Sequence, residues 1–303
     1  MSIQKDINKI VKSTDVATPM DEDVPDLTLL IESLKLSSDN SSQTKLPTFE
    51  TLIKLPENQL QSVLTCLDFI TWPEDVTADL LKMIADTETI SNENAVLLIY
   101  STAYVKIMAL SSSASRLLMN SIIQLSMRKG QCVINGLIVP LLFQSDLSKL
   151  KVEVIVKSLQ ELSSSQRLSL LRILLSDGEI YFSSKQNRII SSNNRNYLRP
   201  WNDTVFQVIN TILSVQPFIQ FTRETLFDLI QPVRAIVQEH PKDKGSMQLL
   251  LLLTSKYAQT LIEFSAIDMI EDICNMSSMF LKRAVLGQIT SIRKKQEGAL
   301  KLT

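Results

Sequence analysis

Short helical segments follow one another along almost the whole chain, and this pattern constrains the fold more than any other feature. From Leu46 onward, apolar residues recur at three- and four-residue spacing, which is the period of one helix face. Residues that start helices punctuate the segments. Pro56 and Pro73 suit a first helical turn, and Ser91 can cap an N-terminus by accepting a hydrogen bond from a free backbone N–H. The sequence therefore predicts a succession of helices, each about three to four turns long.

The remaining predicted helix starts are the Ser111–Ser115 run, Ser164 or Ser165, Trp201 to Asp203, Thr222, Gly245–Ser246 and Met276 to Ser278. Glycine is scarce, with 6 residues in 303, about 2% against a usual ~7%. Sheet-rich and dinucleotide-binding folds use glycine in turns and phosphate loops. We therefore expect an all-α fold, a HEAT-like helical-repeat solenoid of antiparallel helix pairs. Trp72 and Trp201 each precede a helix start and are expected to pack as anchors.

The expected organisation is a tail followed by one domain. Residues 1–45 gather acidic and small polar residues, such as Asp21 to Asp23 and the linker-like run Ser37 to Ser42, and indicate a short, largely flexible N-terminal tail. Within it, residues 27–34 can form one docked amphipathic turn. Residues 46–303 are expected to form a single α-solenoid domain, interrupted at about 178–199 by a polar insertion rich in Ser and Asn.

Motifs for catalysis or cofactor binding are missing from the sequence. It has no phosphate-binding glycine loop, no nucleophile elbow and no metalloprotease histidine pair. The single histidine, His240, precedes a proline in a polar stretch and is expected to be exposed. Cys66, Cys132 and Cys274 are far apart; the first two lie among apolar residues and are expected in the core. We expect a non-enzymatic interaction surface with no cofactor, metal or small-molecule substrate.

Charge and hydropathy narrow the class of partner. The chain has 31 Lys+Arg against 32 Asp+Glu, a net charge of -1, which disfavours direct nucleic-acid binding along its whole length. No apolar stretch reaches the ~20 residues of a membrane span. The first residues lack the apolar region of a signal peptide, and the cysteines show no disulfide pattern. The expectation is an intracellular protein of a reducing compartment, with no membrane contact.

Basic residues gather in the C-terminal segment, and several interpretations are open. Lys282, Arg283, Arg293 to Lys295 and Lys301 face a lone Glu297. The segment suits a capping helix, whose outer face is polar because no further repeat covers it. It equally suits docking to an acidic partner, nuclear import through residues 292–295, or weak contact with a nucleic-acid backbone.

Four stretches, in collinear order, resemble the C-terminal domain of the Fanconi anaemia complementation group E family. They are LPENQLQSVLTCLDFITWPEDVTADLLKMI, SNENAVLLIYSTAYVKIMALSSSASRLL, PWNDTVFQVINTILSVQPFIQFTRETLFDLI, and SMQLLLLLTSKYAQ with MFLKRAVLGQI. Together the resemblance covers roughly residues 46–290.

The resemblance implies a nuclear, non-enzymatic adaptor of the Fanconi anaemia core complex. Family members hold the group C protein, contact other core-complex subunits and recruit the group D2 protein for monoubiquitination in interstrand-crosslink repair. The family's residue for the group D2 protein falls on Phe280, and its basic residue for the group C protein falls on Lys106. An aromatic hot spot and a basic residue that sets register both suit an interface. Core packing for Phe280 and a solvated helix face for Lys106 are the alternatives.

Three departures from the family indicate a diverged, non-vertebrate member. Vertebrate members carry a long region ahead of this domain, where this chain has a short tail. The insertion at about 178–199 looks longer than the family's loop. Lys106 lacks the planar, bidentate fork that an arginine offers. The alternative functions are a generic helical scaffold outside DNA repair and, third, a nucleic-acid-binding solenoid that uses the basic C-terminal helix.

Overall fold

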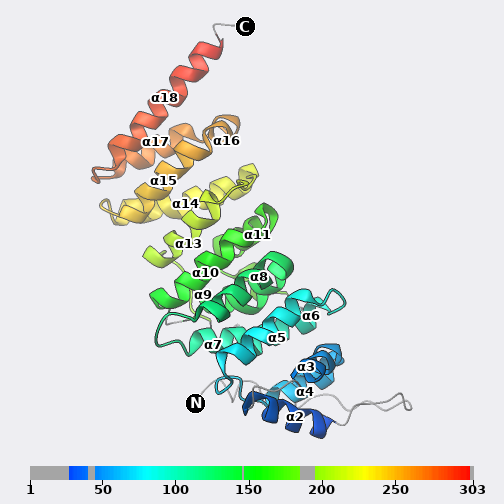
Figure 1. Ribbon diagram of the computed structural model, residues 1–303. Helices are drawn as coiled ribbons and strands as arrows, with labels where there is room; N and C mark the ends of the chain where they lie inside the picture. The colour runs from blue at the N-terminus through cyan, green and yellow to red at the C-terminus, as the bar shows by residue number, and fades with distance from the viewer. Residues whose placement is uncertain (1–26, 40–44, 145–146, 185–194, 301–303) are drawn as a thin grey trace. The chain divides into compact units, whose positions relative to one another are not determined.

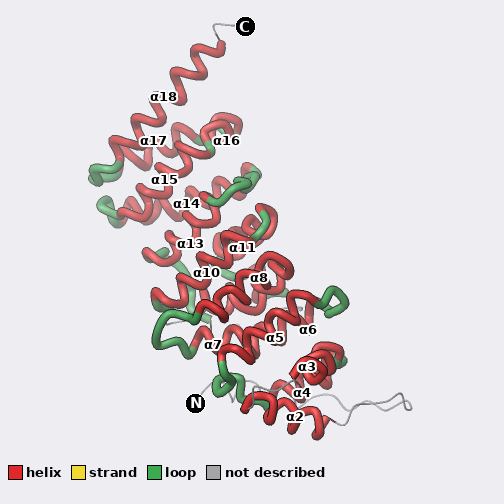
Figure 2. The backbone as a smooth tube through the Cα atoms, viewed as in Figure 1, coloured by secondary structure: helices red, strands yellow, loops and turns green. Residues whose placement is uncertain are grey.

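The computed structural model describes residues 27–39, 45–144, 147–184 and 195–300 (Figure 1). Across these residues the chain forms helices joined by loops and contains no strand (Figure 2). The predicted all-α class is confirmed, and a helical-repeat arrangement is compatible with it. The chain divides into two compact units, Met1–Leu141 and Leu142–Thr303, where the sequence predicted one domain over 46–303.

Helices of the first unit alternate between two rows. They are α2 (Leu27–Asp39), α3 (Lys45–Lys54), α4 (Glu57–Thr65), α5 (Glu74–Asp86), α6 (Asn92–Ile99), η2 (Tyr100–Tyr104), α7 (Val105–Met108), α8 (Arg116–Val133) and η3 (Ile134–Ile138), followed by α9 (Val139–Leu142) at the boundary. One row runs through successive contacts of α3, α5 and α8, and the other through α2, α4, α6 and η3. Each new helix therefore packs on the preceding member of its own row, an arrangement compatible with a stacked repeat.

The second unit repeats this alternation. Its helices are α10 (Lys149–Glu161), α11 (Ser164–Leu175), α12 (Glu179–Phe182), α13 (Asp203–Ser214), α14 (Arg223–Glu239), α15 (Lys244–Lys256), α16 (Ala258–Glu263), α17 (Ile267–Met276) and α18 (Lys282–Leu300). Contacts link α10, α13, α15 and α18 in one row, and α11, α14 and α17 in the other. Figure 1 shows α13, α15 and α18 following one another in chain order.

Local signals in the sequence place most helix starts correctly. A side-chain oxygen caps the helix at four predicted positions, Ser91, Ser115, Asn202 and Thr222. Three predicted starts are displaced. Ser163, one residue before Ser164, caps α11, and Asp243 caps α15 in place of the Gly-Ser pair that follows it. Helix α18 begins at Lys282, beyond the start predicted at Met276 to Ser278. Pro56 and Pro73 occupy the N-cap positions of α4 and α5. The Ser, Thr, Asn and Asp caps each pair a backbone N–H that the helix itself leaves unpaired, whereas the two prolines make no side-chain cap bond.

Two π-helical turns meet in the first unit at a glycine. The turn η2 contacts η3, and α6 packs on η3. A Cβ added to Gly136 would lie 2.8 Å from the carbonyl oxygen of Val96 and 3.1 Å from the side chain of Ile99. Only glycine allows this approach of the two backbones, because any side chain would meet a carbonyl oxygen that cannot swing aside.

Arg167 is a fully buried cation in the second unit and has no carboxylate partner among the described residues. Its guanidinium donates to the carbonyl oxygens of Leu162 (3.2 Å), Ile212 (2.7 Å), Val215 (2.8 Å) and Pro217 (2.5 Å). The carbonyls of Ile212, Val215 and Pro217 lie at and beyond the C-terminal end of α13, and that of Leu162 lies at the C-cap of α10; at both helix ends the dipole favours a positive charge. Arg167 therefore ties α11 to α13 and to the loop that follows.

The predicted tail and cysteines need correction. The docked amphipathic turn predicted at residues 27–34 is confirmed as part of helix α2, whose Leu34 is fully buried, but Ser37 to Asp39 continue the helix instead of forming a linker. Residues 1–26 and 40–44 lie outside the described part. Cys132 is buried as expected, but Cys66 is exposed because it lies at the C-cap of α4, on the side away from the core. The apolar neighbours of Cys66 in the sequence gave no indication that the helix ends there and exposes it.

The two tryptophans are anchors, as predicted. Trp72 is buried against the rings of Phe49 (6.0 Å between centroids) and Phe69 (4.6 Å). Trp201 is buried with its ring edge-on to Phe206 at 5.7 Å. Each indole fixes the entry of the helix that follows it.

Candidate partner-binding surfaces

Phe280 lies in the loop between α17 and α18 and faces outward. Its exposed fraction is 78%, the largest among the exposed large apolar side chains of the described residues. The alternative that Phe280 packs in the core is therefore wrong. The Arg283 guanidinium lies 5.2 Å from the centre of the Phe280 ring, within range of a cation–π contact.

Hydrogen bonds hold the loop that presents Phe280. The backbone N–H of Ser278 donates to the Pro241 carbonyl at 2.9 Å, and the Ser277 hydroxyl donates to the same oxygen at 2.9 Å. Lys282 donates from Nζ to the Ser277 carbonyl at 2.9 Å. The loop is thus ordered before any partner arrives, which lowers the entropy cost of binding there.

Helix α18 has one buried and one exposed face. Val285, Ile289 and Ile292 are buried, and the helix contacts α15 and α17. The outer face is formed by exposed small and polar side chains, Arg283, Ala284, Gly287, Gln288, Ser291, Lys294 and Lys295. This polar outer face agrees with the expectation of a capping helix.

The basic run near residue 293 is partly neutralised within the chain. Arg293 pairs with Asp268 at 2.7 Å and with Glu271 at 2.5 Å, and these hydrogen bonds, that to Glu271 first, raise the pKa of the guanidinium. Lys294 and Lys295 stay exposed. The segment proposed for nuclear import therefore offers two free cations, and nuclear localisation stays a prediction.

Lys106 uses its ammonium group inside the first unit. Its Nζ donates to the backbone carbonyls of Ile70, at 2.6 Å, and of Trp72, so it pins the loop between α4 and α5. Burial lowers the pKa of the Lys106 ammonium, while the carboxylates of Glu74 and Asp68 oppose that shift. The alternative of a freely solvated lysine is wrong. Its contact with a group C partner stays a prediction.

The two predicted residues belong to different units, Lys106 to the first and Phe280 to the second. Within the described ranges, no group of three His, Cys, Asp or Glu side chains could hold a metal ion. No helix among them is long and apolar enough to cross a membrane. His240 is exposed, as expected, at the C-cap of α14.

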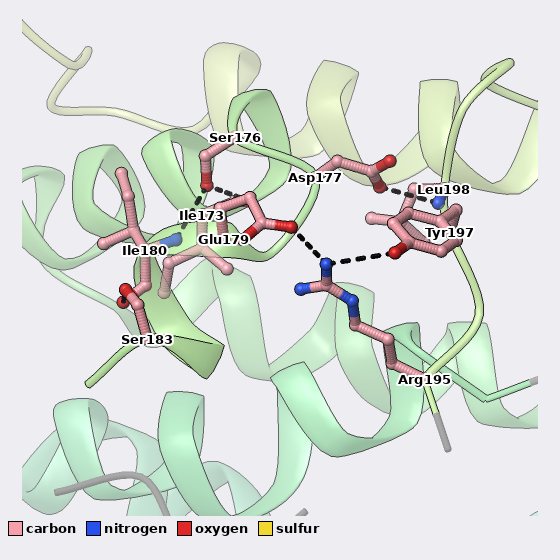
Figure 3. A network of polar contacts seen from close by, with 9 residues as sticks. All are labelled: Ile173, Ser176, Asp177, Glu179, Ile180, Ser183, Arg195, Tyr197 and Leu198. Carbon is pink, nitrogen blue, oxygen red and sulfur yellow. Dashed lines mark hydrogen bonds and ion pairs between the residues drawn. The ribbon is translucent and has the colours of Figure 1, made fainter. Parts of the chain in front are cut away.

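Part of the predicted insertion at 178–199 is anchored around Arg195, which sequence reasoning missed (Figure 3). The Arg195 guanidinium lies 4.7 Å from the Phe182 ring centre and 4.8 Å from that of Tyr197, and it pairs with Glu179. Nearby, the backbone N–H of Leu198 donates to the Asp177 carboxylate at 2.7 Å. Residues 185–194 lie outside the described part. In the sequence, Arg195 and Tyr197 stand two residues apart in an otherwise polar stretch, and this pair was the signal that could have indicated an ordered contact.

Comparison with known proteins adds no family: no family model and no curated protein matches this chain. The resemblance to the Fanconi anaemia group E family therefore rests on the four stretches of sequence alone. The geometry contributes two surfaces that can be tested, the outer face of α18 with Phe280 and the loop pinned by Lys106.

Proposed function

We propose that this chain is a non-enzymatic adaptor of the Fanconi anaemia core complex that bridges the group C protein to the group D2 protein in the nucleus. The proposal joins the sequence resemblance to one observation, the 78% exposure of Phe280 on an ordered loop. Burying a phenylalanine side chain is worth about 1.5–3 kcal/mol. An aromatic residue beside a cation is a typical interface hot spot.

In this proposal the outer face of α18 receives the group D2 protein. Phe280 supplies the apolar anchor, while Arg283, Lys294 and Lys295 supply charges that favour an acidic partner surface and speed its association. The polar face suits a reversible contact, which an adaptor needs if it is to release a modified substrate.

Lys106 would act on the group C protein as a positioning residue. It holds the loop that carries Ile70, whose side chain is 51% exposed. We infer that the group C protein contacts this loop, with Ile70 as the apolar contact. Replacing Lys106 would then weaken binding by releasing the loop.

The proposal is tested by recovering the tagged chain from its own cells after crosslinking damage and probing for the two named proteins. Wild type should retain both. Phe280→Ala should lose the group D2 protein alone, and Lys106→Glu the group C protein alone; Leu117→Ala, at another exposed apolar residue, should retain both. If neither protein is recovered with wild type, the chain is a scaffold outside this pathway.

A further inference from the structure

A cleft of about 960 Å³ opens in the second unit. One wall is the length of α14, and the other is built from the C-terminal end of α11, the start of α12 and the segment before α13. The lining includes Arg172, Ile180, Arg199, Trp201 and, on α14, Glu224, Asp228, Pro232 and Glu239.

The α14 wall carries carboxylates on one stripe. Glu224, Asp228 and Glu239 are separated by four and eleven residues, so all three fall within about one third of the helix circumference. All are exposed, and none forms an ion pair with another described residue.

Pro232 adds a backbone acceptor to this wall. It lies inside α14 and has no N–H, so it cannot donate the helical hydrogen bond to the Asp228 carbonyl. Carboxylates and a carbonyl together make the α14 side a wall of acceptors. A ligand rich in N–H donors complements it.

The opposite wall combines apolar side chains with two guanidinium groups. Arg199 donates to the Leu175 carbonyl, which holds the side chain in place but leaves its positive charge, and Arg172 is exposed. Ile180 is 56% exposed. Trp201 is 5% exposed and its indole N–H has no partner in the described structure. A buried unpaired donor is costly, and the Trp201 side chain would have to turn its N–H into the cleft for a carbonyl group of a bound chain to accept from it.

We propose that this cleft binds a basic segment of a partner polypeptide, with Lys or Arg side chains on the α14 carboxylates and an apolar side chain against Ile180. The three carboxylates of Glu224, Asp228 and Glu239 outnumber the two guanidinium groups of Arg172 and Arg199, and this negative balance sets the sign of the ligand's charge. The site uses none of the residues assigned to the group C and group D2 proteins, so it stands or falls independently of the adaptor role.

A random library of displayed peptides, each about twelve residues long, tests the charge assignment on the full-length chain. Selected peptides should be enriched in Lys and Arg around an apolar residue. Fluorescein-labelled copies are then titrated by anisotropy. The double variant Glu224→Lys with Asp228→Lys should bind them about tenfold more weakly or worse. Glu263→Lys with Asp272→Lys changes the net charge equally at exposed positions outside the cleft and should bind as wild type does.

Selection of acidic peptides, failure to select any peptide, or equal weakening by the two double variants would overturn the proposal. Ile180→Asn is a second variant, since it removes the apolar contact without changing the charge of the cleft, and unchanged affinity there would also contradict the proposal. Phe280→Ala should bind the same peptides as wild type does, which separates this site from the proposed adaptor surface.

Discussion

Replacing Arg167 by methionine should destabilise the second unit more than any other single substitution considered for it. Methionine fills much of the same volume, but four carbonyl oxygens lose their donor in a site with no exposed surface. Each buried acceptor left unpaired costs about 1–3 kcal/mol, offset in part because the buried charge is removed too. We expect a net loss of about 4 kcal/mol, a large share of the ~5–15 kcal/mol that holds a domain folded.

Urea unfolding followed by tryptophan fluorescence measures this loss. The chain has two tryptophans, one in each unit, so a Trp72→Phe background leaves Trp201 to report the second unit. At a slope of ~2 kcal/mol per molar urea, the midpoint for Arg167→Met should fall by about 2 M. Arg172→Met, an exposed arginine of the same helix, is the matched control and should change stability by less than about 0.5 kcal/mol. Equal midpoints for the two variants would refute the role given to the four carbonyls.

Three further outcomes are expected. Gly136→Ala should cost about 1–3 kcal/mol in denaturant unfolding because the new methyl meets a backbone carbonyl, whereas Gly287→Ala, whose Cβ meets nothing within 4 Å, should be neutral or stabilising; similar losses would contradict the packing argument. Lys106→Met should lower the stability of the first unit by about 1–3 kcal/mol, and an unchanged midpoint would mean that its two carbonyl contacts contribute nothing. Cys66 should react rapidly with a thiol reagent, and Cys274 only on unfolding, because burial, followed by the charge of a neighbouring glutamate, raises the pKa of Cys274 to about 12; rapid reaction of Cys274 in the native protein would contradict this.

Local signals in the sequence predicted the helices, because their causes are local. Ser91 and Asn202 cap helices through bonds that reach three residues along the chain. Apolar spacing reports which face of each helix is buried, and the buried stripe of α18 at Val285 and Ile289 follows it. These features hold whatever the rest of the chain does.

Features that depend on distant partners were not predictable in the same way. Arg167 bonds carbonyls 45 to 50 residues away, and nothing near it in sequence marks it as buried. Lys106 likewise finds its acceptors 34 to 36 residues earlier. Cys66 has apolar neighbours, yet a helix end turns it outward. The apolar periodicity predicts which side of a helix is buried, but not which distant residues contact that side.

The candidate surfaces also combine features that the sequence predicts with features that depend on distant contacts. The resemblance singled out Phe280, but its exposure depends on a loop tied to Pro241, and sequence left core packing open. The cleft along α14 was not predicted. In the sequence its acidic residues are indistinguishable from ordinary solvated charges, and only the fold brings the segment around Trp201 opposite them. Sequence gives the residues of a surface, and folding decides which of them meet.

The affinity of the purified chain for the purified group D2 protein of the same organism tests the central claim most directly. Biolayer interferometry should show saturable binding by wild type and binding weaker by about tenfold or more for Phe280→Ala, with the unfolding midpoint unchanged. Tyr197→Ala, at an exposed aromatic outside this surface, should bind as wild type does. No binding by wild type, or equal affinity for Phe280→Ala, would contradict the adaptor account.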